Sequence, residues 1–212
     1  MTPEDVEQLF TRSDGSFLFA RWGRPIAPIV FGVDDATVAV VKGAVEAMSD
    51  LTGQPLMETD AELGSNLMFF FFREWDELLD VPDLDQLVPD LAALVGRLKE
   101  QEAHQYRFFR FDEQGAIKAA FSFMCMGGAL ADMPAESLAL AEVAQVTLLW
   151  SDTAFTSRSP LAQTAQGVHV LHPEIAAVIK AAYDPVLPAM EQDPSMALRL
   201  AARARIVFTP ES

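Results

Sequence analysis

The residues of this chain most suggestive of chemistry are Glu142 and Gln145, which interrupt a strongly apolar helical segment predicted over residues 134–150. Residues three apart share one face of a helix, and Leu138 and Leu149 lie on that face a turn to either side. Burying a carboxylate without partners is costly, and ionisable groups in such places often mark functional sites. Two interpretations follow: a half-exposed face that tolerates two polar residues, or a vestigial catalytic site built on both.

Arg107 and Arg110 alternate with aromatic residues in a segment predicted to be a strand over residues 105–111. A guanidinium binds a carboxylate or another anion through paired hydrogen bonds, so both arginines are candidate binding residues. The alternative is that they form ordinary ion pairs with some of the many acidic residues on the surface.

His169, His172 and Glu174 are of the types that hold metal ions. However, residues 168–171 are predicted to be extended, and residues three apart in a strand point to opposite faces. His172 directly precedes Pro173, which is typical of a helix start. Because the chain has three His, one Cys and neither a Cys-x-x-Cys nor a His-Glu-x-x-His motif, we expect neither a metal site nor a cofactor.

The overall composition excludes several classes of partner. The 212 residues include 31 acidic and 15 basic side chains, for a formal net charge of −16. Such a charge repels nucleic acid and anionic lipid, so we expect neither nucleic-acid nor membrane binding. The N-terminal residues lack the pattern of a signal peptide, and the longest strongly apolar run, 67–72, is too short to span a bilayer. We therefore expect a cytoplasmic protein. The single cysteine, Cys125, is expected to pack in the core.

Hydrophobic periodicity predicts an α+β fold with a mixed or antiparallel sheet, in a single domain over residues 1–212. Residues 1–150 are expected to form the α+β part, with a long helix backing the sheet, and residues 151–212 a helical C-terminal part. The expected strands are 17–22, 26–33, 67–72 and a hairpin over 105–126, and the expected helices are 2–11, 36–52, two or three short ones in 73–100, 134–150, 173–183 and 194–205.

The order of these elements resembles the N-terminal part of zincin metalloproteases, where a sheet and backing helix precede the helix that carries His-Glu-x-x-His. More closely, the chain resembles an uncharacterised bacterial domain-of-unknown-function family that is similar to a degenerate zincin. The residues that carry this resemblance are Ala141-Glu142-Val143-Ala144-Gln145, Leu148-Leu149-Trp150-Ser151-Asp152, Ala182-Tyr183-Asp184-Pro185, Thr52-Gly53 and Asn66. The resemblance adds Asp152 and Tyr183 to the candidate binding residues.

The resemblance also implies that the metal site is dismantled. Ala141 and Gln145 occupy the positions of the two zinc-binding histidines, and neither is a good zinc ligand. We therefore lean against an enzyme and favour a non-catalytic zincin-like protein that binds a peptide or protein partner in a cleft beside an edge strand. One alternative is an atypical metal-dependent hydrolase or peptidase that uses Glu142, with Gln145 and a distant carboxylate or His172. Another is a structural subunit that self-associates; the oligomeric state stays open.

Overall fold

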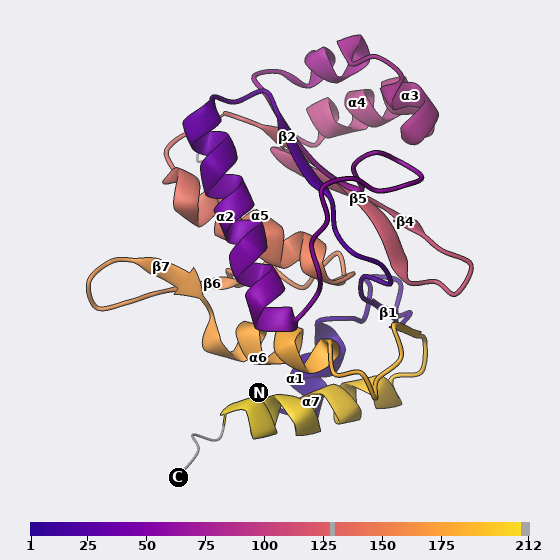
Figure 1. Cartoon of the computed structure of the whole chain (residues 1–212), viewed down its shortest axis with the longest axis vertical. Helices are drawn as coiled ribbons and strands as arrows, with labels where there is room; N and C mark the ends of the chain where they lie inside the picture. Colours follow the sequence, from indigo (N-terminus) through magenta and orange to yellow (C-terminus); the bar gives the residue numbers. More distant parts are fainter. Residues whose placement is uncertain (128–129, 209–212) are drawn as a thin grey trace.

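The chain has an α+β fold built on a mixed four-stranded sheet (Figure 1). The computed structural model describes residues 1–127 and 130–208. The strand order is β2 (Pro28–Phe31), β3 (Leu67–Phe72), β5 (Ile117–Cys125) and β4 (Gln105–Phe111). β2, β3 and β5 are parallel, whereas β4 is the antiparallel partner of β5 and lies at the edge. The predicted hairpin over 105–126 is confirmed, and β2, which begins at Pro28, lies at the other edge of the sheet.

Two helices pack on one face of this sheet through the larger of two buried apolar clusters. α2 (Asp35–Thr52) begins at the N-cap Asp34 and ends at Gly53, which adopts a left-handed conformation with φ of 72°. This is the long backing helix predicted from the sequence. α5 (Ala135–Thr147) crosses next to it and carries Glu142 and Gln145; it ends three residues earlier than predicted, because Leu148 is already extended.

The opposite face of the sheet is covered by three short helices: η1 (Trp75–Asp80), α3 (Leu84–Leu87) and α4 (Leu91–Glu100). They enclose the second apolar cluster. The four consecutive phenylalanines of β3 alternate between the clusters, with Phe69 and Phe71 in the first and Phe70 and Phe72 in the second. This explains why the strand is apolar at every position: both of its faces are buried.

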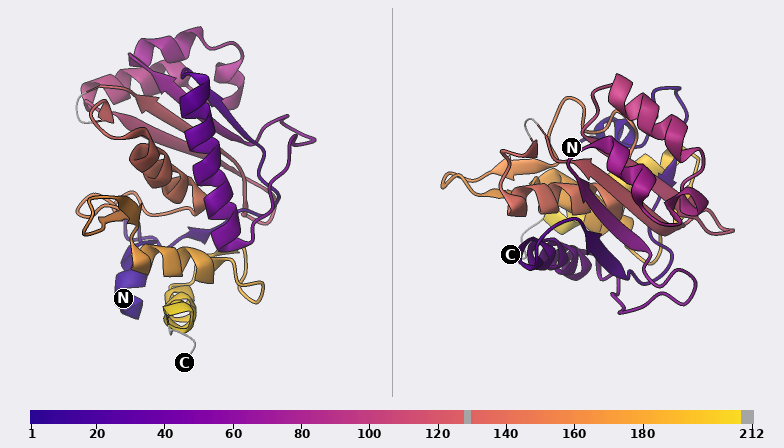
Figure 2. Two further views of the ribbon diagram at one scale, coloured as in Figure 1. Left: turned by 60° about the vertical axis from the view of Figure 1, so that its left-hand side comes forward. Right: turned by 90° about the horizontal axis from the view of Figure 1, so that it is seen from above.

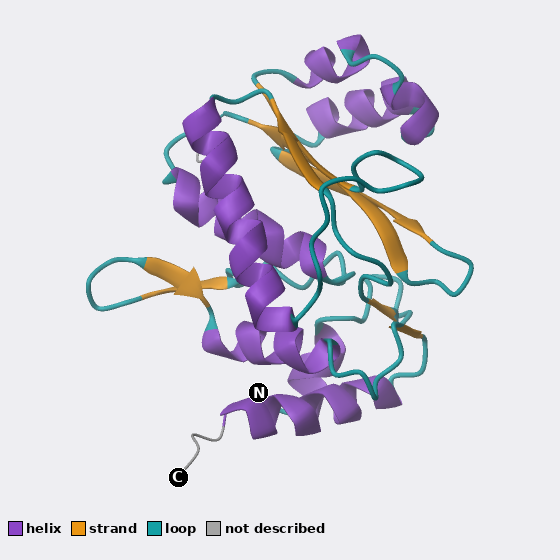
Figure 3. Ribbon diagram, viewed as in Figure 1, coloured by secondary structure: helices purple, strands orange, loops and turns teal. Residues whose placement is uncertain are grey.

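The remaining elements gather at the end of the molecule away from the three short helices (Figures 1 and 2). The predicted helices of the C-terminal part are confirmed, and the segment predicted to be extended over 168–171 forms a short strand. Residues 151–212 also hold short strands that the sequence did not indicate, over 161–163 and 190–191, and all strands are drawn in orange in Figure 3. The elements gathered at this end of the molecule are the helices α1 (Pro3–Gln8), α6 (Pro173–Ala182) and α7 (Ser195–Phe208). Two antiparallel strand pairs lie with them: β1 (Phe19–Ala20) with β8 (Met190–Glu191), and β6 (Leu161–Gln163) with β7 (His169–Leu171).

The larger apolar cluster includes residues from both expected parts of the chain, for example Val146 before residue 150 and Val178 and Leu200 after it. The expected single domain over 1–212 includes residues 128–129 and 209–212, which lie outside the described residues. Within the described part, no helix is both long enough and apolar enough to cross a membrane.

Candidate functional site

Glu142 is buried against the sheet, with only 1% of its surface exposed. Its carboxylate accepts two charge-assisted hydrogen bonds from Arg107 on β4: Nε lies 2.5 Å from Oε1, and Nη2 lies 2.6 Å from Oε2. Strand alternation directs Arg107 to the side of the sheet where α5 packs. The paired fork geometry is the strongest form of arginine–carboxylate contact.

Two further polar side chains complete the shell around this carboxylate. Ser122 of β5 donates to Oε1 at 2.7 Å, and Gln105 of β4 donates to Oε2 at 3.2 Å. Each oxygen of Glu142 therefore accepts two hydrogen bonds, which offsets the cost of burying the charge. The half-exposed interpretation of this helix face is wrong for Glu142, whereas Gln145 is half-buried. Sequence reasoning missed Gln105 and Ser122, although Ser122 is the one polar residue within the apolar run 119–126.

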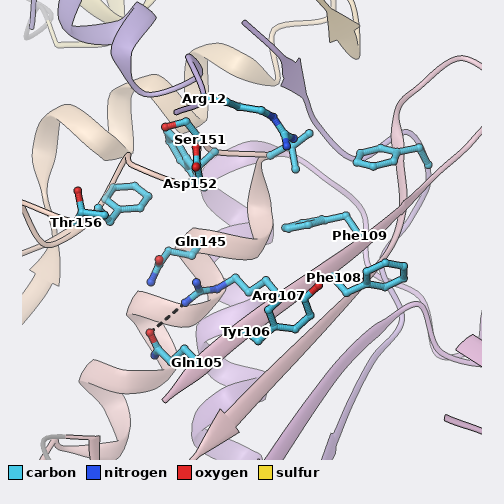
Figure 4. Close-up of a pocket in the computed structure, with 14 residues that line it drawn as sticks. Arg12, Gln105, Tyr106, Arg107, Phe108, Phe109, Gln145, Ser151, Asp152 and Thr156 are labelled. Atoms are coloured by element: carbon cyan, nitrogen blue, oxygen red, sulfur yellow. Dashed lines mark hydrogen bonds between the residues drawn. The ribbon is translucent and has the colours of Figure 1, made fainter. Parts of the chain in front are cut away.

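A groove of about 560 Å³ lies directly beside this ion pair, between β4 and the segment that follows α5. Of the predicted site residues, it brings together Arg107, Gln145 and Asp152 (Figure 4). Gln145 lies next to Arg107, and its amide donates to the Ala141 carbonyl at 3.3 Å. Phe109, Trp150 and Phe155 supply apolar surface, and the rest of the lining includes Arg12, Gln105, Tyr106, Phe108, Phe111, Leu149, Ser151 and Thr156.

The groove runs along the outer edge of β4. The Cys125 N–H donates to the His104 carbonyl at 2.9 Å, so even-numbered residues of β4 exchange hydrogen bonds with β5. In an antiparallel pair the alternate residues point their N–H and C=O groups outward; here these are Gln105, Arg107 and Phe109. No strand pairs with this edge in the part of the chain that the structure describes.

Asp152 forms the far wall of the groove together with the N-terminal segment. It accepts hydrogen bonds from both the hydroxyl and the backbone N–H of Ser13, the latter at 2.9 Å. The hydrogen bond from the Ser13 hydroxyl lowers the pKa of the Asp152 carboxyl most, and the bond from the Ser13 backbone N–H lowers it further. Asp152 therefore stays ionised near neutral pH and ties the turn at 12–16, with Arg12, to the wall of the groove.

Two of the predicted binding residues lie elsewhere. Arg110 is an odd number of positions from Arg107, so strand alternation places it on the opposite face of the sheet. Tyr183 packs against α5 away from the groove, where its hydroxyl donates to the Thr147 carbonyl at 2.8 Å and Arg21 lies 5.5 Å from its ring centre. Burial raises the pKa of the Tyr183 hydroxyl well above its ordinary value. Its structural setting is that of a packing residue.

His172 takes the structural role that its sequence context indicated. His172 is the N-cap of α6 and its Nδ1 accepts from the Glu174 N–H at 3.3 Å, while Nδ1 of His169 lies 2.7 Å from the Ser137 hydroxyl. Among the described residues, no three His, Cys, Asp or Glu side chains gather as a metal site would require. Cys125 is half-buried at the end of β5, less enclosed than expected, and burial raises the pKa of its thiol.

No family model, no curated protein and no solved structure matches this chain.

Proposed function

We propose that this protein is a non-catalytic, zincin-like scaffold that binds an extended segment of a peptide or protein partner along the free edge of β4. The observation that carries the proposal is the coincidence of two features: outward-pointing backbone groups at Gln105, Arg107 and Phe109, and a groove beside them with aromatic surface. An added strand gains affinity from main-chain hydrogen bonds and selectivity from pockets for alternate side chains.

The arrangement of elements supports the zincin-like part of the proposal. Three parallel strands, an antiparallel edge strand and two helices on one face, α2 and α5, follow in the order expected from the resemblance. Ala141 and Gln145, which the resemblance matches to the two zinc-binding histidines, lie one turn apart on α5. The Gln145 amide donates a hydrogen bond to the Ala141 carbonyl.

The surroundings of Glu142 support a non-catalytic role. A general base needs a free oxygen within reach of the proton it removes. Both oxygens of this carboxylate instead accept from Arg107, Ser122 and Gln105. The carboxylate therefore acts as an anchor that fixes α5 against the edge of the sheet and holds one side of the groove in place.

The test uses a random library of blocked nine-residue peptides, with binding measured by fluorescence anisotropy. For the tightest peptide, N-methylation is scanned along the backbone. Strand addition predicts that methyl groups at alternate amides weaken binding about tenfold, whereas methyl groups at the amides between them have little effect, because only alternate amides face β4. A methylation scan without this alternation would argue against binding at the strand edge.

A matched pair of variants locates the bound peptide. Phe155→Ala removes apolar surface from the groove and is expected to weaken binding, while Val168→Ala removes an exposed side chain on the β6–β7 turn and is expected to have no effect. The same incubations analysed by mass spectrometry test the hydrolase alternative. Peptide fragments formed by the wild type and absent with Glu142→Gln would overturn the non-catalytic assignment, and a library without any binder would overturn the proposal as a whole.

A further inference from the structure

The opposite end of the molecule carries a second groove, which is apolar and lies between the β2 edge of the sheet and the short helices η1 and α3. It has a volume of about 640 Å³. Phe31 on β2 is 42% exposed and stacks on Phe70, with ring centres 4.9 Å apart. The other apolar residues that line this groove are Met68, Phe71, Phe72, Val81, Pro82, Leu84 and Leu87. Large apolar side chains left exposed around a concave surface are typical of interaction sites.

The rim of this groove is acidic. Residues 74–90 hold seven carboxylates and no Lys or Arg. Asp80 lines the apolar groove and also an adjoining hollow, which contains Asp85, Asp90 and the 48% exposed Leu79. Among the described residues, Asp80, Asp85 and Asp90 form no salt bridge, whereas Asp76 pairs with Lys99 at 2.7 Å. The groove therefore combines apolar contact area with unneutralised negative charge.

The β2 edge cannot bind an extended strand as the β4 edge can. The Leu67 N–H donates to the Ala27 carbonyl at 3.2 Å, so odd-numbered residues of β2 face β3 and the even-numbered Pro28 and Val30 face outward. Pro28 has no N–H to donate, which leaves Val30 as the only outward donor of this short strand. A ligand here must be held by side-chain contacts, as an amphipathic helix in a groove is.

We propose that this second groove binds a basic amphipathic helix of a partner protein, with apolar residues on Phe31 and its neighbours and Lys or Arg side chains against Asp80, Asp85 and Asp90. Charge complementarity argues for this occupant: Lys or Arg side chains offset the charge of these carboxylates while the apolar face of the helix covers the apolar surface. This groove shares no lining residue with the groove at the β4 edge. Failure of one of the two proposed binding sites would therefore leave the other unaffected.

The test uses two fluorescent 18-residue peptides of identical Leu and Lys composition, one with helical periodicity of its leucines and one scrambled. The amphipathic peptide is expected to bind at least about tenfold more tightly, because only it presents apolar and basic residues together. The triple variant D80N/D85N/D90N should weaken its binding about tenfold. The control E46Q/D50N/E113Q changes the net charge equally but alters exposed acids elsewhere, and should leave binding unchanged.

The apolar contact is tested with F31A, which is expected to weaken binding, against V186A, which trims a side chain that is 75% exposed outside the groove. Thermal unfolding of each variant confirms that it is folded. Equal binding of both peptides, or equal loss in both triple variants, would show adsorption to an acidic surface and overturn the proposal, as would no binding. Self-association of the wild type that D80N/D85N/D90N abolishes would instead identify a second copy of this chain as the occupant and overturn the assignment to a partner.

Discussion

The guanidinium of Arg107 binds the buried carboxylate of Glu142 through two hydrogen bonds of 2.5 and 2.6 Å, and so joins the edge strand β4 to the helix α5. Side-chain exposure is 20% for Arg107 and 1% for Glu142. The pair separates the groove from the core: the carboxylate lies on the core side, and the arginine also lines the groove. Arg107, which the proposed partner would contact, is therefore held in position by Glu142.

Glu142→Leu is expected to destabilise the protein by about 3 kcal/mol, because it leaves the Arg107 charge partly buried without its partner. The double variant Glu142→Leu/Arg107→Leu should recover a large part of this loss, since replacing both members of a buried pair by apolar residues is often close to neutral. Urea unfolding of the two single variants and the double variant measures the coupling. Additive losses in the double variant would contradict a direct interaction.

The hydroxyl of Tyr183 is expected to make the free energy of unfolding fall as the pH rises through the alkaline range. Because burial raises the folded-state pKa of Tyr183 above that of the unfolded chain, which is about 10, its contribution is complete below pH 10. It is then lost as the pH rises toward the folded-state pKa. Urea unfolding between pH 8 and pH 11 should show this decline in the wild type.

The matched variant for this decline is Tyr183→Phe. It should be about 1 kcal/mol less stable than the wild type at pH 8, through loss of the hydrogen bond to the Thr147 carbonyl. It should also lose less stability between pH 8 and pH 11, because no phenol remains to ionise at this position. Parallel pH profiles of the two proteins would show that the Tyr183 hydroxyl is not the source of the alkaline loss.

Gly32, which directly follows β2, cannot accept a side chain. Its φ is +85°, and a Cβ atom built on it would lie 2.1 Å from the Phe71 carbonyl oxygen. Gly32→Ala is therefore expected to destabilise the protein by at least about 2 kcal/mol. Gly43→Ala, inside α2 with open space around it, should instead stabilise by about 0.5–1 kcal/mol. Thermal unfolding measures the stability change in both variants. Equal changes would contradict the close approach of Gly32 to the Phe71 carbonyl oxygen.

Elements whose residues indicate their own environment could be predicted from the amino-acid sequence alone. The apolar spacing from Val38 to Leu51 together with the Asp34 and Gly53 caps predicts α2, because a helix is formed by residues close in the chain. The run of phenylalanines in β3 predicts a strand buried on both faces. The groove at the β4 edge was expected only in general terms, as a cleft beside an edge strand.

Which distant side chains contact one another depends on the tertiary structure and could not be predicted from the sequence. Arg107 and Glu142 lie 35 residues apart, and no local pattern links them: whether they touch depends on which face of β4 turns to α5 and on how that helix crosses the sheet. The same holds for the β1–β8 pair: a strand was expected over 17–22, but its partner β8 has only two residues and leaves no periodic pattern. Sequence fixes local periodicity, whereas contacts between distant segments depend on how the elements pack; for this reason Glu142 and Arg107 were both singled out from the sequence, yet not as partners.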